Sequence, residues 1–334
     1  MKRAAHQQHR HQPSDSILAA LSVDLLIQIL ERVDDPRDRK AWRLVCRDFF
    51  RAEALHRRAL RVLRLEALPG LLRRYAACLD LLDLSACPGL GDHSLAAALF
   101  AGSGSWRLKS VSLSRASGVG WRGLAALAAA CPCLESVDLS HCVGVGDREA
   151  AALAAAEGLR MLRLDKCLRV TDVGLAKLAV GCPALENLRI KWCLEISDIG
   201  IELLAKKCQD LRVLDISYLK VTSPPNLSVN FFRKSPTFWD FFPFQITNSS
   251  VKSISSLGKL EVLSMVGCSN IDDEGLEFLN NGSSSLRVTM KYLSRCSELM
   301  ILKLGLCDKI SSEGLVHIAS NCKNLYELDL YRYG

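Results

Sequence analysis

The stretch Leu159–Cys167, with the sequence LRMLRLDKC, decides the fold of this chain. Its apolar residues follow the pattern Leu-x-x-Leu-x-Leu-x-x-Cys, in which Leu162 and Leu164 alternate with outward-facing positions, as in a half-buried strand. The sequence that follows predicts a short helix, because its apolar side chains recur at i, i+3, i+4 and i+7. These side chains are Leu175, Leu178, Ala179 and Cys182.

This strand-and-helix unit repeats along most of the chain. The same pattern, with Val or Ile at some leucine positions, begins at Leu79, Leu108, Leu134, Leu185, Leu211, Leu260, Leu299 and Leu325. Most of these starts are 25 or 26 residues apart. A unit of this size cannot bury its own leucines, so neighbouring units must stack. We therefore predict an α/β fold, a leucine-rich-repeat solenoid or horseshoe with parallel strands on its concave face.

Eleven of the fourteen cysteines occupy two positions of the repeat. Six follow the strand and five close the helix: Cys87, Cys142, Cys167, Cys193, Cys268 and Cys307, and Cys131, Cys182, Cys208, Cys296 and Cys322. Buried free cysteine behaves as a small hydrophobic residue, so this pattern indicates a reduced, intracellular protein. The repeat also explains Cys131 in the Cys131-x-Cys133 pair, so we expect no metal site there and no cofactor.

One glycine motif imitates a dinucleotide-binding loop. Gly118, Gly120 and Gly123 match the spacing GxGxxG between a predicted strand and a predicted helix. Gly123 lies fifteen residues after the first leucine of its repeat, and four other repeats have glycine at the same position: Gly174, Gly200, Gly275 and Gly314. We therefore interpret it as the glycine that begins the helix of each repeat.

Composition excludes several classes of protein. Of 334 residues, 49% are apolar and 24% are charged, which excludes collagen and wholly disordered chains. No apolar run reaches the length needed to span a membrane, and the polar, His-rich start at residues 1–15 is unlike a signal peptide. We expect a protein of the nucleus or cytoplasm that does not bind membranes.

The N-terminal part follows a different pattern. The segment Leu21–Val33 carries an apolar helical face that ends at Asp34-Asp35-Pro36, and a second helical segment follows with Trp42 and Phe49. The sequences LSVDLL at 21–26 and WRLVCRDF at 42–49 resemble an F-box, with Ser22 where that family usually has proline. Together with the cysteine-containing repeats, the chain resembles F-box/leucine-rich-repeat proteins, and most closely the plant F-box/LRR-repeat protein 3 type.

This resemblance implies a function without catalysis. In the family, the F-box binds the Skp-type adaptor of a Skp–cullin–F-box ubiquitin ligase, and the repeats hold a substrate protein for ubiquitination and proteasomal degradation. It implies these adaptor-binding residues or their supports: Leu21, Asp24, Leu25, Leu26, Ile29, Leu30, Val45, Cys46 and Phe49. The expected organisation is a disordered tail (1–15), the F-box (16–60), a helical linker and cap (61–78) and the repeats (79–334).

The charge distribution leaves two other classes of function to weigh. Residues 37–74 contain twelve Arg or Lys residues and four acidic residues, which suits an acidic partner. These basic residues interleave with core positions and no nucleic-acid recognition motif accompanies them, so we expect no nucleic-acid binding. The other class is a leucine-rich-repeat scaffold or inhibitor, in which the helical segment only caps the solenoid.

The middle repeats carry the strongest candidate for a substrate site. Their predicted strands present large charged side chains outward, whereas the earlier repeats present mainly serine and aspartate. The candidate substrate-binding residues are Arg163, Asp165, Arg189, Lys191 and Trp192. Neighbouring strands lie about 4.8 Å apart, so Arg163 and Arg189 should be adjacent. Arginine and an aromatic side chain are typical of binding hot spots.

The repeat is interrupted at three places. The spacing from Leu211 to Leu260 is 49 residues, and we assign the excess to a non-repeat insert at 222–246, rich in phenylalanine. Only thirteen residues separate Leu286 from Leu299, which indicates that repeat sequence is missing. The last strand pattern ends at Tyr333-Gly334 with no helix after it, so we expect a solenoid truncated at the C-terminus.

Overall fold

The computed structural model describes residues 21–75, 78–100, 106–219, 246–279 and 296–331. Residues up to Arg58 form one compact unit, and residues from Ala59 onward form another. The predicted N-terminal tail, most of the predicted insert and the pair Tyr333-Gly334 lie outside the described residues.

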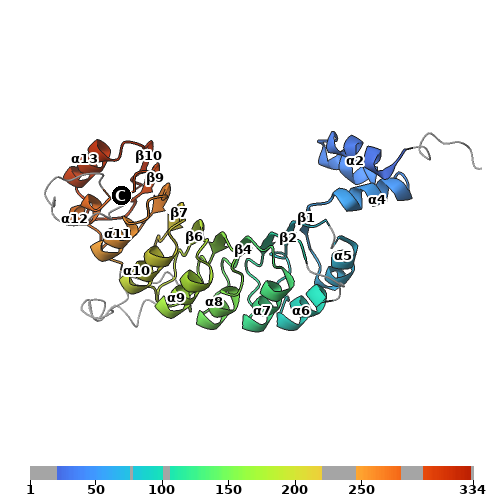
Figure 1. Ribbon diagram of the computed structural model, residues 1–334, viewed down its shortest axis with the longest axis horizontal. Coiled ribbons are helices and arrows are strands. Elements are labelled where there is room, and N and C mark those ends of the chain that lie inside the picture. The colour runs from blue at the N-terminus through green and yellow to red at the C-terminus, as the bar shows by residue number, and fades with distance from the viewer. Residues whose placement is uncertain (1–20, 76–77, 101–105, 220–245, 280–295, 332–334) are drawn as a thin grey trace, which may run out of the picture. The chain divides into compact units, whose positions relative to one another are not determined.

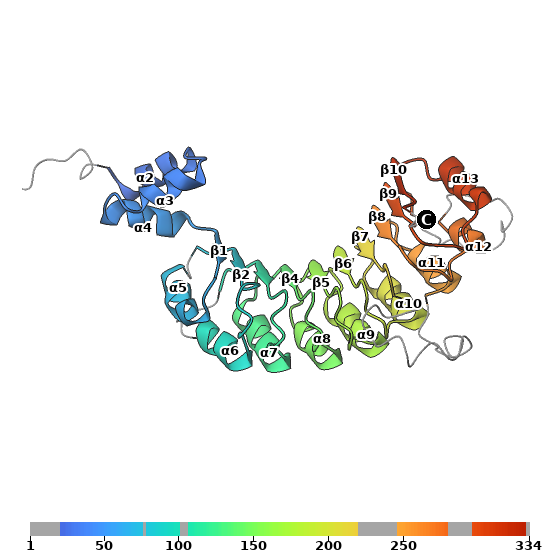
Figure 2. The same ribbon diagram turned by 180° about the vertical axis from the view of Figure 1, so that it is seen from behind.

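In the described residues of the second unit, ten short parallel strands form one sheet, and each strand pairs with the next one along the chain. They are β1 (Ala59–Arg61), β2 (Leu81–Asp83), β3 (Ser110–Ser112), β4 (Ser136–Asp138), β5 (Met161–Arg163), β6 (Asn187–Arg189), β7 (Val213–Asp215), β8 (Val262–Ser264), β9 (Ile301–Lys303) and β10 (Glu327–Asp329). The sheet lines the inner side of this unit and the helices lie on its outer side (Figures 1 and 2). The predicted solenoid is therefore confirmed.

Each strand from β1 to β9 leads into the helix of its own repeat. The helices are α5 (Leu68–Tyr75), α6 (Asp92–Phe100), α7 (Trp121–Ala130), α8 (Asp147–Leu153), α9 (Asp172–Gly181), α10 (Asp198–Lys207), α11 (Asn248–Ile254), α12 (Asp273–Glu277) and α13 (Ser312–Asn321), and a 3-10 turn, η1, covers Leu65–Ala67. Successive helices from α5 to α13 pack against one another. The leucines that the sequence assigns to strand and helix interiors, such as Leu162, Leu175 and Leu188, are fully buried between the two layers.

The cysteines that follow the strands join neighbouring repeats. The Cys167 thiol donates to the carbonyl oxygen of Leu139 at 3.3 Å, and the Cys193 thiol donates to that of Leu164 at 3.2 Å. Burial raises the pKa of Cys193 to about 12, so this thiol stays protonated and able to donate. The same bond recurs at Cys87, Cys142, Cys268 and Cys307. Polar as well as apolar contacts therefore hold successive repeats in register.

The first residue of helices α6, α8, α9, α10 and α12 is an aspartate, and each of these aspartates accepts a hydrogen bond from the next repeat. Asp172 accepts hydrogen bonds from the backbone N–H of Ser197 (2.8 Å), the Ser197 hydroxyl (2.5 Å) and the backbone N–H of Gly200 (3.1 Å). A Cβ on Gly200 would lie 2.3 Å from the Asp172 carboxylate. Gly123 has the same relation to Asp92, at 2.6 Å. The GxGxxG spacing thus has a structural explanation, since its last glycine makes room for this aspartate.

The sheet begins earlier than Leu79, where we expected the repeats to start. Strand β1 lies in the segment assigned to the end of the F-box and the linker, and its Leu60 pairs with Leu82 of β2. Leu60 and Val62 are both buried, as are the alternating apolar residues of later strands. The sequence analysis missed this strand because it lacks the full leucine pattern.

The repeat continues across the insert. Strand β7 pairs directly with β8, and Thr247 donates from its backbone N–H and its hydroxyl to Asp198, at 2.8 and 2.6 Å. Ile246, which we assigned to the insert, is only 1% exposed. It precedes the helix N-cap at Thr247, as Val170 precedes the N-cap at Thr171. The insert therefore ends before Ile246, because the core requires an apolar side chain at this position.

The second interruption also leaves the sheet continuous. Strands β8 and β9 are direct neighbours, with Leu263 opposite Leu302. The pattern that begins at Leu286 therefore places no strand between them. Leu286 itself lies outside the described residues.

The described part of the first unit, residues 21–58, contains three helices: α2 (Val23–Glu31), α3 (Pro36–Trp42) and α4 (Arg47–His56). The predicted second helical segment is in fact two helices, because the chain turns between Trp42 and Arg47. Ser22, where the F-box family usually has proline, is the N-cap of α2, and its hydroxyl accepts from the backbone N–H of Leu25 at 3.3 Å. The serine thus supplies a helix-start device of its own.

Candidate functional site

Helix α2 divides its apolar side chains between the core and the surface. Leu26 and Leu30 are buried and belong to the core of the first unit. Leu25 and Ile29 are 45% and 44% exposed, and they share a face of the helix because they are four residues apart. Of the residues predicted to contact an adaptor, Leu26 and Leu30 are therefore supports, whereas Leu25 and Ile29 are available to a partner.

The turn between α3 and α4 exposes two more apolar side chains. Leu44 is 82% exposed and Val45 is 55% exposed. With Leu25 and Ile29 they define what we call the N-terminal apolar surface. The sequence analysis missed Leu44, because a residue in a turn follows no helical period. In the sequence, only the position of Leu44 beside Val45, in a segment rich in charged residues, indicates that it could be exposed.

The other predicted adaptor residues are partly buried or polar. Leu21, Cys46 and Phe49 are half-buried, and Asp24 is exposed in the first turn of α2. The ring of Phe49 packs on Trp42 with 4.4 Å between centroids, and Trp42 Nε1 donates to the Phe49 carbonyl at 3.2 Å. This pair anchors α4 to the end of α3 and so supports the turn that carries Leu44 and Val45.

Basic side chains are frequent near this turn. Arg37, Lys40, Arg47 and Arg51 are all exposed on α3 and α4. The first unit therefore combines exposed apolar side chains with positive charge, which suits an acidic protein partner with an apolar contact surface.

The five predicted substrate-binding residues lie together on strands β5 and β6 and in the turns that follow them. The sheet register places Arg163 directly opposite Arg189, as the repeat spacing predicted. The Nε atoms of both arginines are buried, and neither has a hydrogen-bond partner among the described residues. These two side chains define what we call the concave arginine pair.

The other three predicted substrate-binding residues are engaged within the protein. Lys191 Nζ lies 3.0 Å from the carboxylate of Asp215, which is buried. Asp165 accepts from the backbone N–H of Lys191 at 3.1 Å, and burial raises the pKa of Asp165. The Trp192 ring stacks on Tyr218 with 4.5 Å between centroids. Through these contacts Asp165, Lys191 and Trp192 each bind a residue of the neighbouring repeat.

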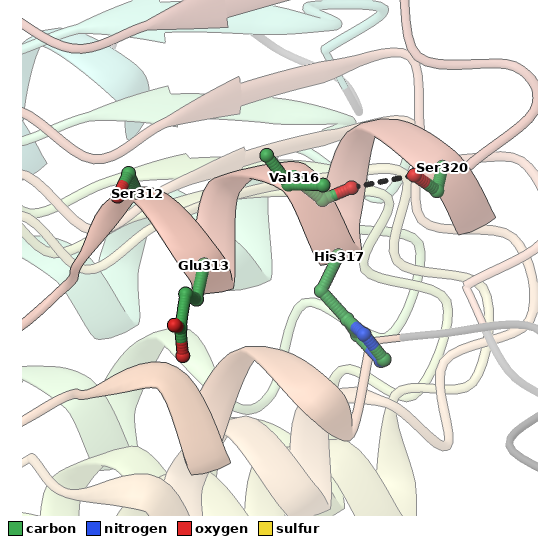
Figure 3. Close-up of a pocket in the computed structure, with 5 residues that line it drawn as sticks. All are labelled: Ser312, Glu313, Val316, His317 and Ser320. Carbon is green, nitrogen blue, oxygen red and sulfur yellow. Dashed lines mark hydrogen bonds between the residues drawn. The ribbon is translucent and has the colours of Figure 1, made fainter.

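A shallow pocket lies against helix α13 (Figure 3). Its lining residues are Ser312, Glu313, Val316, His317 and Ser320, all on that helix. Within the helix, the Ser320 hydroxyl donates to the Val316 carbonyl at 2.7 Å. Among the described residues, no second element contributes a lining residue, and we assign the pocket no function.

The described residues contain no cluster of three or more His, Cys, Asp or Glu side chains that could hold a metal ion. In the same part of the chain, no helix has the length and apolarity to cross a membrane.

Comparison with solved structures found remote likenesses. The yeast Rad7–Elc1 complex matches with 12% sequence identity and a TM-score of 0.46, and the match covers 93% of this chain and 89% of that chain. The mouse RP105/MD-1 complex matches with 16% identity, 82% and 42% coverage and a TM-score of 0.42. An internalin (InlF) from Listeria monocytogenes matches with 18% identity, 79% and 65% coverage and a TM-score of 0.40. At these identities and scores the likenesses add nothing on function.

Comparison with known families identified both parts of the chain. The F-box family matches residues 20–59, which contain helices α2 to α4 and the N-terminal apolar surface. The Leucine Rich repeat family matches residues 130–154, which contain strand β4 and helix α8. The chain therefore carries an F-box segment in its first unit and leucine-rich repeats in its second.

Proposed function

We propose that this chain is the substrate-recognition subunit of a Skp–cullin–F-box ubiquitin ligase. In this role the F-box binds a Skp-type adaptor and, through it, the cullin. The solenoid holds a substrate protein for ubiquitination and proteasomal degradation. No residue of the chain has to perform chemistry, because the other subunits of the ligase transfer ubiquitin.

The observation that carries this proposal is the exposure of the N-terminal apolar surface within the segment that matches the F-box family. Four large apolar side chains in water are unfavourable in a unit this small, and burial against a partner removes that cost. Neighbouring arginines and lysines favour an acidic adaptor and speed its association. Leu26, Leu30, Cys46 and Phe49 support this surface from inside or beneath it.

The sheet supports a role for the second unit in holding a substrate. Ten strands present their outward side chains on one continuous surface, of which the concave arginine pair is the most highly charged part. We also propose that the chain is of the plant F-box/LRR-repeat protein 3 type and that it acts in the nucleus or cytoplasm.

Calorimetry of the purified chain with a Skp-type adaptor tests the proposal. The informative variant is Val45→Asp combined with Ile29→Asp, because both side chains are exposed and their replacement leaves the core intact. The matched control is Val180→Asp, since Val180 is 67% exposed on α9 and lies in the solenoid. We expect tight binding by the wild type and by the control, and loss of binding by the double variant.

Leu26→Ala is a poorer test, because Leu26 is fully buried. Its truncation should lower the stability of the unit by about 2–5 kcal/mol, so a loss of binding could reflect unfolding. Absence of adaptor binding by a folded wild type would refute the proposal. The chain would then be a leucine-rich-repeat scaffold or inhibitor, whose N-terminal helices serve only as a cap.

A further inference from the structure

We propose that the concave arginine pair binds an oxyanion carried by a peptide segment of the substrate, either a carboxylate or a phosphate. This inference rests on the proposed function, because it names the chemistry of the substrate that the solenoid would hold. It assigns ligand binding to Arg163 and Arg189 and excludes Asp165, Lys191 and Trp192 from it.

The first argument is the position of the two arginines. They face each other across β5 and β6, and neighbouring strands are about 4.8 Å apart. In the sheet register each arginine has the other arginine on one side and an aspartate, Asp138 or Asp215, on the other side. An arginine fork matches the oxygens of carboxylate and phosphate groups, so two adjacent forks suit a group with several oxygens or two neighbouring acidic side chains.

The second argument is the lack of acceptors within the protein. The buried Nε atoms of Arg163 and Arg189 have no hydrogen-bond partner among the described residues. A buried donor without a partner is costly and is rare in folded proteins. An oxyanion bound against the two guanidinium groups would supply acceptors that the described residues do not.

The third argument is that the neighbouring carboxylates have other partners. Asp138, opposite Arg163, accepts from the backbone N–H of Ser140 at 2.8 Å. Asp215, opposite Arg189, pairs with Lys191 at 3.0 Å and accepts from the backbone N–H of Ser217 at 3.2 Å.

The third carboxylate of this neighbourhood, that of Asp165, accepts from the backbone N–H of Lys191. The three carboxylates thus hold turns and strands together. In the described residues, none of them forms an ion pair with either arginine. Among the described residues, these three carboxylates have partners within the protein, whereas the Nε atoms of Arg163 and Arg189 have none.

Fluorescence anisotropy at low ionic strength tests the inference with three labelled peptides of equal length. Each has Gly-Ser flanks, and the centre is six glutamates, two phosphoserines or further Gly-Ser residues. The informative variant is R163Q/R189Q. The matched control is K206Q/K207Q, which removes the same charge from two exposed residues on α10. Circular dichroism checks that both variants are folded.

We expect the glutamate or the phosphoserine peptide to bind the wild type and the control alike. In R163Q/R189Q, binding should weaken by about tenfold or more, since hydrogen bonds to charged groups are lost. Binding of the glutamate peptide alone identifies a carboxylate as the ligand, and binding of the phosphoserine peptide alone identifies a phosphate. Binding of both supports a site for either oxyanion.

Two results would overturn the inference. One is that neither anionic peptide binds better than the Gly-Ser peptide. The other is that the two double variants weaken binding equally, since binding would then reflect net charge alone. Adaptor calorimetry on R163Q/R189Q separates this failure from that of the proposed function, because the variant leaves the N-terminal apolar surface unchanged.

Discussion

The contact between Asp172 and Gly200 predicts that two substitutions that are each destabilising will partly cancel when combined. Asp172→Ala removes the acceptor of three hydrogen bonds from Ser197 and Gly200. Gly200→Ala introduces a Cβ that would lie 2.3 Å from the Asp172 carboxylate, so the carboxylate must move and weaken the same bonds. Once the carboxylate is gone, the added methyl group meets much less resistance.

The magnitudes follow from these contacts. Asp172→Ala leaves two buried backbone N–H groups without an acceptor, at about 1–3 kcal/mol each, so we expect a loss of about 2–6 kcal/mol. Gly200→Ala in the wild type should cost about 1–3 kcal/mol, typical of overpacking. In the Asp172→Ala background the same change should be neutral or stabilising, because alanine is about 1 kcal/mol better than glycine inside a helix.

Urea unfolding followed by circular dichroism measures the four free energies of unfolding. We expect a coupling energy of at least about 1 kcal/mol between the two positions. Asp308→Ala is the control for removal of an exposed aspartate, and it should change stability by less than about 0.5 kcal/mol. Additive effects of the two substitutions would refute the assignment of Gly200 as a partner of this carboxylate.

Three further predictions concern other contacts. The buried Cys193, with its pKa raised to about 12, should resist alkylation at pH 8 in the native state while the exposed Cys133 reacts. Mass spectrometry of labelled peptides measures the alkylation rate of each cysteine. Equal rates would contradict the burial of Cys193. Ser22→Ala should destabilise the F-box by about 0.5–1 kcal/mol through loss of the N-cap, as thermal melting will test. Lys191→Ala should destabilise the solenoid by about 1–3 kcal/mol in urea, because it leaves the buried Asp215 without its cation; an unchanged unfolding midpoint would show that Lys191 is free for a ligand.

Much of the fold could be predicted from the sequence, because stacking repeats requires the same residue types at the same spacing. The leucine pattern predicted β5 and β6, and its spacing predicted that Arg163 faces Arg189. The pattern missed β1, whose buried Leu60 and Val62 lack the flanking leucine and cysteine. It also placed Ile246 in the insert, although the core uses this side chain.

The candidate sites were less predictable, because they depend on which side chains the fold leaves exposed. Periodicity grouped Leu25 with Leu26, and only the structure separates the exposed leucine from the buried one. Periodicity also cannot reveal Leu44, which lies in a turn. Lys191 looked as available as Arg189 in the sequence, but its ion pair runs to Asp215 on the next strand.

The bond between Asp198 and Thr247 has a consequence for how this family can change in evolution. Because β7 pairs with β8 and Asp198 binds Thr247, both contacts between these repeats are made regardless of how many residues separate Val221 from Ile246. Each doubling of the length of a flexible loop costs only about 0.6 kcal/mol in loop-closure entropy. Removal of residues 222–245 restores the 25-residue spacing that separates Leu134 from Leu159. New sequence can therefore enter or leave a repeat at this point while the strands keep their order.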